Sequence, residues 1–478
     1  MRIHSYFYEQ AQKYPDYVAL SEQHNRWTYR ELAECVSNRA SALIQDGAMP
    51  GHIFIIKLEN CMEWIQDALA VSKIGGIIMP VHPDVTEIEW QTIISSAEPN
   101  WIITSKETLC QTIEPSTISL PFRHVNSKDE LYFIGYTSGS TGTPKGFVKS
   151  HQSWTSSFEG WSKAFSLIES DRVVVPLHLS YSAQLYPALH ALAIGAEIVL
   201  LSKFTPDAFL KAKGSCASIT PALIEPLIRH AKNKGSVQEM IPRCMISVGT
   251  KLLPIQRQKF EECFPKSFLY EYYGSSEMGY ASLLTPEDAR AAPETVGISF
   301  PDVEIAFFNE KKERVVTNKE NFGKLFVRSG QAFEGYIKNA KQTKATFIED
   351  WVTSHDIGFQ REDGKIVLVG RDRDIIKAAG SFVYAGEIED VLLGIAGVKE
   401  AVVYSEKDEN RGEIIRAVIV KEFSQELVDI QKECRQKLIS YKQPRNWTVL
   451  SHLPKKPNGK VDKMKLRAEL LSDKLSNT

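Results

Sequence analysis

Apolar and polar positions follow two different periods along the first 250 residues of the chain. Short apolar runs predict strands at residues 53–58, 77–81, 101–104, 131–134, 172–177, 197–201, 215–220 and 244–248. Apolar residues that recur every three or four positions predict helices at residues 31–44, 62–73, 183–194, 206–212 and 221–234. Strands that alternate with helices predict a parallel sheet with crossover helices. Residues 1–48 are expected to be helical, with a capping box formed by Thr28 and Glu31.

The pattern changes from about Val296, where short strands are separated by charged turns. From residue 375 the alternation returns, with helices expected at 386–393 and 425–439 and strands at 398–405 and 414–421. The sequence therefore predicts an α/β protein. A large N-terminal domain of parallel βα subdomains would span residues 1–373, with a small β-rich subdomain from about 296. A small α+β C-terminal domain would span residues 374–478.

Composition narrows the class of protein. The 478 residues are 43% hydrophobic and 24% charged, which is typical of a soluble globular chain of several subdomains. The net charge of −2 gives no general attraction to nucleic acid or to anionic membranes. No apolar run reaches membrane-spanning length, and the N-terminus lacks the apolar block of a secretory signal. Seven scattered cysteines without zinc spacing indicate reduced thiols and a cytoplasmic location.

The strongest chemical signal is the stretch YTSGSTGTPKG at residues 136–146. Its glycines let main-chain N–H groups approach an anion, its hydroxyls add donors, and Lys145 adds a positive charge. This pattern is typical of a phosphate cradle, although a flexible surface loop would have a similar composition. It differs from the P-loop of ATPases, because Gly146 follows Lys145 where a Mg²⁺-binding hydroxyl would stand.

Five further stretches carry side chains suited to a nucleotide. YYGSSE at residues 272–277 offers Tyr273 to stack on a flat base and Glu277 to hold Mg²⁺. WVTSHD at 351–356 places Asp356 after a polar turn, where a carboxylate could bind a ribose diol. The other three stretches are a glycine turn, a charged run and a basic turn. Their sequences are SVGTKLLP at 247–254, GRDRD at 370–374 and KKPNGK at 455–460. Each stretch taken alone also fits an ordinary turn or solvated face.

Their order and spacing carry more information than any single stretch. Two further motifs are TYREL at 28–32 and KIGGIIMPVHP at 73–83. The charged run extends to GRDRDIIKAAG at 370–380, and the basic turn continues into NGKVDK at 458–463. On these motifs the chain resembles, over nearly its whole length, the adenylate-forming superfamily of acyl-CoA synthetases, peptide-synthetase adenylation domains and luciferases. It departs from the family pattern at Ser276, which replaces a threonine, and at Ser354 and His355, which replace Thr-Gly.

The resemblance implies a reaction in two steps. A carboxylate first attacks the α-phosphate of ATP, and a thiol then converts the acyl-adenylate to a thioester with release of AMP. The small domain would rotate about a hinge at Asp374, and this rotation would withdraw the catalytic Lys460 and present the loop of Lys377 and Gly380 to a pantetheine arm.

The resemblance also implies roles for individual residues. Ser276 would contact the α-phosphate, and Glu277 with Thr137 would hold Mg²⁺. The remaining nucleotide-binding residues would be Thr137, Ser138, Gly139, Ser140, Thr141, Gly142, Lys145, Gly249, Thr250, Tyr273, Gly274, Asp356 and Arg371. Among these, Asp356 and Arg371 would bind the ribose hydroxyls and Tyr273 would flank the adenine.

The acid pocket is expected at residues 176–182, PLHLSYS. Amino-acid-activating relatives carry an aspartate in this stretch, and its absence here disfavours an α-amino acid, whose ammonium would have no partner. The stretch looks more like the PLFHxxG element of acyl-CoA synthetases, with His178 one place early. His178 or Tyr181 would gate the pocket, and a buried structural histidine is an equal alternative. Further pocket residues would be Ser182, Val248 and Ser275.

Three functions remain open from the sequence. The leading hypothesis is an ATP- and Mg²⁺-dependent ligase that joins a small carboxylic acid to CoA. The alternative is a stand-alone enzyme that loads the acyl group onto the phosphopantetheine of a carrier protein. A nucleotide-binding protein without catalysis is disfavoured, because Lys145, Glu277 and Lys460 are all present. The motifs do not indicate the acyl chain or the oligomeric state.

Overall fold

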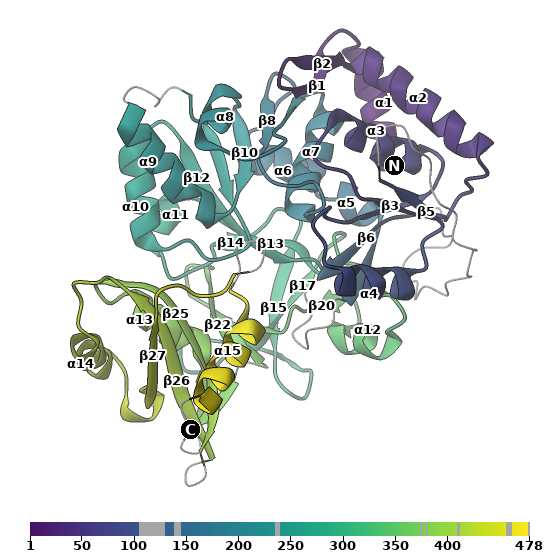
Figure 1. Cartoon of the computed structure of the whole chain (residues 1–478). Coiled ribbons are helices and arrows are strands. Elements are labelled where there is room, and N and C mark those ends of the chain that lie inside the picture. Colours follow the sequence, from purple (N-terminus) through teal and green to yellow (C-terminus); the bar gives the residue numbers. More distant parts are fainter. Residues whose placement is uncertain are drawn as a thin grey trace. The chain divides into compact units, whose positions relative to one another are not determined.

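The computed structural model describes residues 1–104, 130–137, 145–234, 240–372, 375–378, 381–408, 412–455 and 461–476. It confirms the mixed α/β class (Figure 1). The chain divides into two units. The large unit contains Met1–Ile305 and Val327–Ser354, and the small unit contains Ala306–Phe326 and His355–Thr478. The proposed hinge, Asp374, lies outside the described residues, so the domain boundary predicted there stays a prediction.

A nine-stranded sheet forms one half of the large unit, in the order β14-β13-β12-β11-β10-β8-β9-β1-β2. Its strands are β1 (Val18–Glu22), β2 (Asn25–Thr28), β8 (Arg172–Val175), β9 (Glu197–Leu200), β10 (Cys216–Ile219), β11 (Cys244–Ser247), β12 (Phe268–Ser275), β13 (Gly279–Leu284) and β14 (Ile298–Ser299). Strands β8 to β12 pair in parallel, as the alternating pattern predicts. Their carboxyl ends therefore lie along one edge of the sheet.

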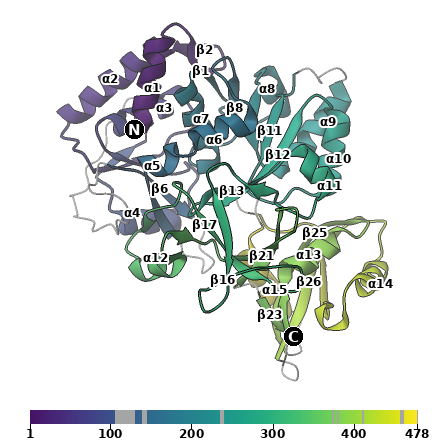
Figure 2. The ribbon, with the colours of Figure 1, turned by 180° about the vertical axis from the view of Figure 1, so that it is seen from behind.

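Helices pack against this sheet and form a hydrophobic core with its strands. They are α5 (His151–Thr155), α6 (Phe158–Phe165), α7 (Ser182–Ile194), α8 (Pro206–Lys211), α9 (Ile224–Lys234), α10 (Pro254–Cys263) and α11 (Pro286–Ala291). Phe209 of α8, Leu227 of α9 and Phe260 of α10 are fully buried in one cluster with strand residues such as Ile219. Helix α7 lies against β8, β9 and β10 (Figure 2).

A six-stranded sheet forms the other half, in the order β18-β7-β6-β4-β3-β5. Its elements are β3 (Ile53–Ile56), α3 (Met62–Lys73), β4 (Ile77–Pro80), α4 (Glu87–Ala97), β5 (Trp101–Ile103), β6 (Leu131–Thr137), β7 (Lys145–Ser150) and β18 (Gly335–Tyr336). Strands β3 to β6 are parallel, whereas β7 pairs antiparallel with β6. The glycine-rich stretch thus connects two strands of a hairpin, and the second strand was absent from the predicted elements.

The prediction of a helical N-terminus is wrong for residues 18–28. Helices α1 (Ile3–Lys13) and α2 (Tyr29–Gln45) flank a hairpin of β1 and β2, and β1 joins β9 in parallel. Ala19 and Leu20 are adjacent and both fully buried, which is the burial pattern of a strand in a sheet rather than of an amphipathic helix. The apolar residues on either side recur at helical intervals, and for this reason the short strand was not predicted from the sequence. The predicted capping box is confirmed, because Thr28 Oγ1 accepts from the Glu31 N–H and the Thr28 N–H donates to Glu31.

Short strands follow from residue 304, as expected. They are β15 (Glu304–Phe308), β16 (Arg314–Val315), β17 (Gly323–Arg328), β19 (Phe347–Ile348), β20 (Trp351–Val352), β21 (Asp356–Gln360) and β22 (Ile366–Arg371), with one helix, α12 (Ala340–Thr346). The pairs β15–β16, β17–β20, β17–β21, β19–β20 and β21–β22 are antiparallel. Strand β21 pairs with β22 in the small unit and places Asp356 opposite Arg371.

The C-terminal part of the small unit is a five-stranded sheet covered by helices on both faces. Its elements are β23 (Ile375–Ala378), β24 (Ser381–Tyr384), α13 (Ala385–Leu393), β25 (Val398–Asp408), β26 (Gly412–Lys421), α14 (Leu427–Lys437), β27 (Asn446–Leu450) and α15 (Lys463–Ser476). Val403 packs in the cluster of α13 and α14, whereas its neighbour Val402 packs in the cluster of α15. This alternation confirms the expected α+β module. Within the described residues, no helix is long and apolar enough to cross a membrane.

Candidate active site

The large unit brings predicted site residues together at one edge of its nine-stranded sheet. His178 and Tyr181 follow β8, Val248 to Thr250 follow β11, and Tyr273 to Ser275 form the end of β12. Because β8, β10, β11 and β12 are neighbours and parallel, these residues leave the sheet on the same side. Ligands of open α/β sheets bind outside the carboxyl ends of the strands, so this edge is the candidate site.

The YGSSE element forms the tight turn between β12 and β13. The register shifts between Tyr273 and Gly274, and a Cβ added to Gly274 would lie 2.2 Å from the carbonyl oxygen of Gly279. Only glycine fits this close approach of two strands. Ser275 Oγ accepts a hydrogen bond from the Met278 N–H at 3.3 Å, which closes the turn around Ser276 and Glu277. The local sequence therefore presents a hydroxyl and a carboxylate together at the sheet edge.

Glu277 is held from a second segment of the chain. The Tyr336 hydroxyl donates to Glu277 Oε1 at 2.6 Å, and the Phe333 N–H donates to the Glu277 carbonyl at 2.9 Å. No group of three or more His, Cys, Asp or Glu residues that could hold a metal occurs among the described residues. A single carboxylate fits Mg²⁺ that arrives with ATP, because Mg²⁺ usually binds one or two carboxylates together with phosphates and water.

The glycine-rich stretch is anchored at both ends by the six-stranded sheet. Thr137 ends β6 and Lys145 begins β7, and the two residues are direct partners in the hairpin. A Cβ on Gly146 would lie 2.8 Å from the end of the Ile337 side chain, so a larger residue here would require Ile337 to move. The predicted phosphate contacts Ser138, Gly139, Ser140, Thr141 and Gly142 lie outside the described residues.

Two of the motifs meet through their hydroxyl groups. The Tyr273 hydroxyl lies 2.9 Å from Ser354 Oγ, so the YGSSE element is hydrogen-bonded to the WVTSHD element within the large unit. The serine that replaces the family's threonine therefore keeps a hydroxyl at this position. The bond fixes the ring of Tyr273, which is the residue expected to flank the adenine.

The predicted ribose-binding pair forms within the small unit. Arg371 Nε donates to Asp356 Oδ1 at 2.9 Å, and Asp356 is buried. The neighbouring carboxylate, Asp372, also has two partners: its Oδ2 lies 3.3 Å from His355 Nδ1 and 2.6 Å from Lys324 Nζ. Burial raises the pKa of Asp372, but the hydrogen bonds from His355 and Lys324 outweigh this effect and lower it to about 2. Asp372 is therefore a carboxylate at neutral pH.

His355 replaces a glycine of the family pattern and has a left-handed backbone, with φ +68°. Few residues other than glycine adopt this conformation, although histidine does so more often than most side chains, as asparagine and aspartate do. The backbone at this position therefore has a conformation that favours glycine, while the side chain places an imidazole beside Asp372. Although Ser354 and His355 differ from the Thr-Gly of the family motif, Asp356 still lies opposite Arg371.

His178 has the environment of a structural residue. Its Nε2 donates to the Leu58 carbonyl at 2.9 Å, and its Nδ1 accepts from the Ser180 N–H at 3.0 Å. Burial and the neighbouring His82 lower the pKa of His178 to about 4, so the ring is neutral. This environment favours the structural alternative for His178.

Tyr181 and His82 lie beside this ring. Tyr181 is half-buried at the N-terminus of α7, and its ring centroid is 6.1 Å from that of His82. The His82 ring lies against that of His178, with the centroids 4.4 Å apart and the ring planes tilted by 53°. The gating role therefore remains a prediction for Tyr181, while Ser182 begins α7 beside it.

Several site residues escaped the sequence reasoning. Asn60 joins the two sheets, because its amide donates to the Leu177 and Leu201 carbonyls at 2.9 and 3.1 Å. Tyr336 and His82 contact predicted site residues from distant parts of the chain. Only His82 had a sequence signal, since it lies within the KIGGIIMPVHP element. Lys460, Asp374 and Gly380 lie outside the described residues, as do the side chains of Thr137 and Lys377.

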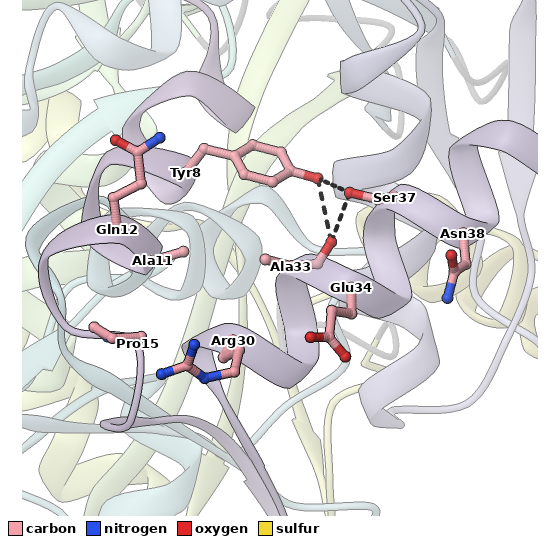
Figure 3. Close-up of a pocket in the computed structure, with 9 residues that line it drawn as sticks. All are labelled: Tyr8, Ala11, Gln12, Pro15, Arg30, Ala33, Glu34, Ser37 and Asn38. Atoms are coloured by element: carbon pink, nitrogen blue, oxygen red, sulfur yellow. Dashed lines mark hydrogen bonds between the residues drawn. The ribbon is translucent and has the colours of Figure 1, made fainter.

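A separate groove of about 530 Å³ lies between α1 and α2 (Figure 3). At its rim the Tyr8 hydroxyl lies 2.9 Å from Ser37 Oγ, and Ser37 Oγ donates to the Ala33 carbonyl at 2.8 Å. None of the predicted catalytic or nucleotide-binding residues lines this groove. It is therefore not the site that the motifs indicate.

Comparisons with known proteins agree with this geometry. The family model described as AMP-binding enzyme matches residues 7–337, and the model of the AMP-binding enzyme C-terminal domain matches residues 387–460. The chain is 29% identical to the uncharacterized acyl–CoA ligase YhfT of Bacillus subtilis, over 96% of each chain. It is 26% identical to gramicidin S synthase 2 of Brevibacillus brevis, over 97% of this chain and 11% of the synthase.

Among solved structures, the amide bond synthetase McbA from Marinactinospora thermotolerans superposes with a TM-score of 0.86 at 23% identity. The match covers 98% of this chain and 99% of the synthetase. This similarity shows a shared fold over nearly the whole chain. The matched family models span both the strand-edge motifs and the C-terminal module. The protein belongs to the AMP-binding enzyme family.

Proposed function

We propose that this protein is an AMP-forming acid–thiol ligase that activates a carboxylic acid with ATP and transfers the acyl group to CoA. In the first step a carboxylate oxygen attacks the α-phosphorus, the bond between the α-phosphorus and the bridging oxygen breaks, and pyrophosphate leaves. In the second step a thiol sulfur attacks the acyl carbonyl, AMP leaves and the thiol proton passes to solvent. Both products of the second step, thioester and AMP, follow from these bond changes.

One observation carries the proposal. The residues that the family motifs assign to the nucleotide and the acid come from separate strands and emerge at one edge of parallel strands. Substitution at phosphorus needs positioning and neutralisation of charge more than covalent chemistry from the protein. An edge that presents Ser276, Glu277 and Tyr273 together suits this requirement.

The residues of this edge have distinct tasks. Ser276 would donate a hydrogen bond to the α-phosphate, and Tyr273, held by Ser354, would lie against the adenine. Glu277, oriented by the Tyr336 hydroxyl, would hold Mg²⁺. When bound, Mg²⁺ would neutralise phosphate charge and polarise the phosphoryl oxygens. Lys145 and the hydroxyls of the glycine-rich stretch would bind the β- and γ-phosphates.

The small unit would contribute the rest of the nucleotide site. Asp356, fixed by Arg371, would accept hydrogen bonds from the ribose hydroxyls. Lys460 would bridge the carboxylate and the α-phosphate in the first step, when negative charge accumulates there. A rotation about Asp374 would then bring Lys377 and Gly380 to the entering thiol, so that the same domain serves both steps.

The acid is proposed to lack an α-amino group. The segment that would meet it, residues 176–182, contains no carboxylate, and His178 is neutral and bonded to the Leu58 carbonyl. A substrate ammonium buried there would have no charged partner in this segment. CoA is the proposed acceptor because the chain matches an acyl–CoA ligase over 96% of that protein's length.

Loading of a carrier protein is the second candidate. It is favoured by the 26% identity to a peptide synthetase, which spans nearly this whole chain but 11% of the synthetase. Both acceptors present the same pantetheine thiol. A carrier would need a complementary protein surface, whereas CoA would need contacts to its own phosphates.

The test is a panel of carboxylic acids assayed for pyrophosphate release with ATP and Mg²⁺. A positive acid is then tested with CoA and with a phosphopantetheinylated carrier protein. We expect pyrophosphate with at least one acid, and thioester formation with CoA. Thioester on the carrier alone would support the second candidate. Absence of pyrophosphate with every acid would contradict the proposed reaction.

A further inference from the structure

Lys149 is a buried lysine to which the proposed mechanism gives no role. It lies on β7, four residues after Lys145, and is 8% exposed. Its Nζ donates to the Gln331 carbonyl at 2.7 Å. Burial lowers the pKa of Lys149 to about 8, while the negative charges of Glu277 and Glu334 oppose this effect. A buried ammonium group is costly unless it is paired, so its place beside two carboxylates needs an explanation.

The segment that Lys149 contacts is the same one that holds Glu277. The carbonyl of Gln331 accepts from Lys149, and two residues later the Phe333 N–H donates to the Glu277 carbonyl. Tyr336, at the end of the segment, donates to the Glu277 carboxylate at 2.6 Å. Residues 331–336, which we call the bracing segment, thus contact both the backbone and the side chain of Glu277.

The bracing segment is also tightly fitted to the turn after Glu277. A Cβ on Gly279 would lie 2.6 Å from the Gln331 side chain, and the Tyr280 N–H donates to Gln331 Oε1 at 2.9 Å. On its other side the segment pairs with β7, where the Glu334 N–H donates to the Val148 carbonyl at 2.8 Å. A shift of Gln331 would therefore be transmitted to the turn that carries Glu277.

We propose that Lys149 is a positioning residue for the first half-reaction, which fixes the bracing segment and through it the orientation of the Glu277 carboxylate toward Mg²⁺ and ATP. The inference rests on the proposed function, since that function assigns Glu277 to Mg²⁺. It differs from a purely structural role, in which Lys149 would only neutralise the buried Glu334 and make no difference to metal binding.

The direction of the change in metal affinity separates positioning from simple electrostatics. Lys149 is a positive charge near a metal-binding carboxylate, so its removal would strengthen cation binding if charge alone mattered. Loss of positioning would weaken cation binding, because the carboxylate would no longer be held in place. The proposal therefore predicts the opposite sign from Coulomb's law.

The experiment measures binding of Mn²⁺ in the presence of a non-hydrolysable ATP analogue by electron paramagnetic resonance, together with pyrophosphate release and the melting temperature. Lys149→Met removes the charge and keeps a long side chain, and Lys149→Arg keeps a charged donor. The other two variants are Glu334→Gln alone and Glu334→Gln combined with Lys149→Met. We expect Lys149→Met to weaken Mn²⁺ binding at least about fivefold and to lower kcat about 10- to 100-fold, as displaced catalytic groups do. Lys149→Arg should recover part of both losses.

The double variant decides between the two roles. Removing both buried charges should restore the melting temperature. If Lys149 positions Glu277, Mn²⁺ binding and kcat stay impaired in the double variant although it is stable. The proposal is overturned if the double variant regains both Mn²⁺ binding and kcat. It is also overturned if Lys149→Met binds Mn²⁺ as well as or better than the original protein. If Lys149→Met does not fold, the double variant carries the test.

The outcome can be separated from failure of the proposed function. If the unsubstituted protein releases no pyrophosphate with any acid, the proposed reaction fails. Mn²⁺ binding with the nucleotide analogue then still compares the variants and decides the role of Lys149. If the unsubstituted protein releases pyrophosphate and the variants match it, only the inference about Lys149 fails.

Discussion

Arg371 Nε donates a hydrogen bond to Asp356 Oδ1 at 2.9 Å, so the two residues expected to bind the ribose orient each other. They are direct partners on β21 and β22, and Asp356 is buried. The carboxylate is therefore fixed before any nucleotide arrives. Such preorganisation lowers the entropy lost on binding.

Replacement of Asp356 should weaken ATP use selectively. We expect Asp356→Asn to raise the KM for ATP about 10-fold or more, because a hydrogen bond to a charged group is worth roughly 1.5–3 kcal/mol. The KM for the acid should stay within about twofold. Steady-state kinetics of pyrophosphate release provide the measurement, with the exposed Asp363→Asn as the matched control. Unchanged ATP kinetics would show that the ribose lies elsewhere.

The left-handed backbone of His355 gives a prediction about stability. His355→Gly and His355→Ala both remove the imidazole that faces Asp372, but only glycine adopts φ +68° without strain. The glycine variant should therefore exceed the alanine variant in free energy of unfolding by about 1 kcal/mol. Urea unfolding of the two variants measures this difference. An alanine variant as stable as the glycine variant would contradict the strain at this position.

Asp372 should stabilise the small unit in a pH-dependent manner. The pKa of Asp372 is lowered to about 2 in the folded protein, below its ordinary value of 3.8. A lowered carboxyl pKa contributes stability above the unfolded pKa, and this contribution is lost as the pH falls through the folded value. Asp372→Asn should therefore destabilise the protein at pH 7, by up to about 1 kcal/mol for a half-exposed ion pair. The difference from the original protein should shrink between pH 4 and pH 2 in chemical unfolding. A difference independent of pH would contradict the ion pairs with Lys324 and His355.

His178 and Tyr181 should differ in the effects of their replacement. His178→Asn should cost about 1–3 kcal/mol of stability at pH 7.5, because it removes buried hydrogen bonds. The folded pKa of about 4 lies below the ordinary 6.5, so the difference should shrink as the pH falls from 6.5 toward 4. Tyr181→Phe should leave stability nearly unchanged and alter the KM for the acid. The reverse result, in which His178→Asn is stable and changes acid preference, would identify His178 as the gate.

The sequence pattern predicted the elements that follow a single period. The buried strands β8, β9, β10 and β11 and the helices between them appear where their apolar runs indicate. The hairpin of β1 and β2 was missed because helical periods continue on both sides of it. Strand β7 was missed because its residues Lys145, Lys149 and Ser150 are polar, although Lys149 and Ser150 are buried.

In the candidate site, too, local features were predictable from the sequence and contacts between distant segments were not. Each motif is local, and the structure holds Tyr273 and Glu277 around one turn of the large unit and pairs Asp356 with Arg371 in the small unit. Their roles toward ATP stay predictions. The partners that orient these residues were not predictable. Tyr336 is 59 residues from Glu277, and such a contact depends on strand pairing between distant segments. The strained conformation of His355 is likewise set by the surrounding turn and not by its own preference.

Lys460 should be needed for one half-reaction only. We expect Lys460→Ala to abolish pyrophosphate release from acid and ATP, because the charge that builds up on the α-phosphate would lack its partner. Thioester formation from a supplied acyl-adenylate and CoA should be largely retained. The control is Lys455→Ala, which removes a lysine that pairs with Glu400 in the same C-terminal region. A first step that proceeds undiminished would contradict the assignment.

The central claim is that the acid attacks the α-phosphate of ATP, and isotope transfer tests it most directly. An accepted acid labelled with ¹⁸O in its carboxylate is converted with ATP, Mg²⁺ and CoA, and the products are analysed by mass spectrometry. The account predicts one labelled oxygen in AMP and none in pyrophosphate, because the attacking carboxylate oxygen stays on the α-phosphorus. Label in inorganic phosphate, with ADP as the nucleotide product, would show attack at the γ-phosphate and contradict the account.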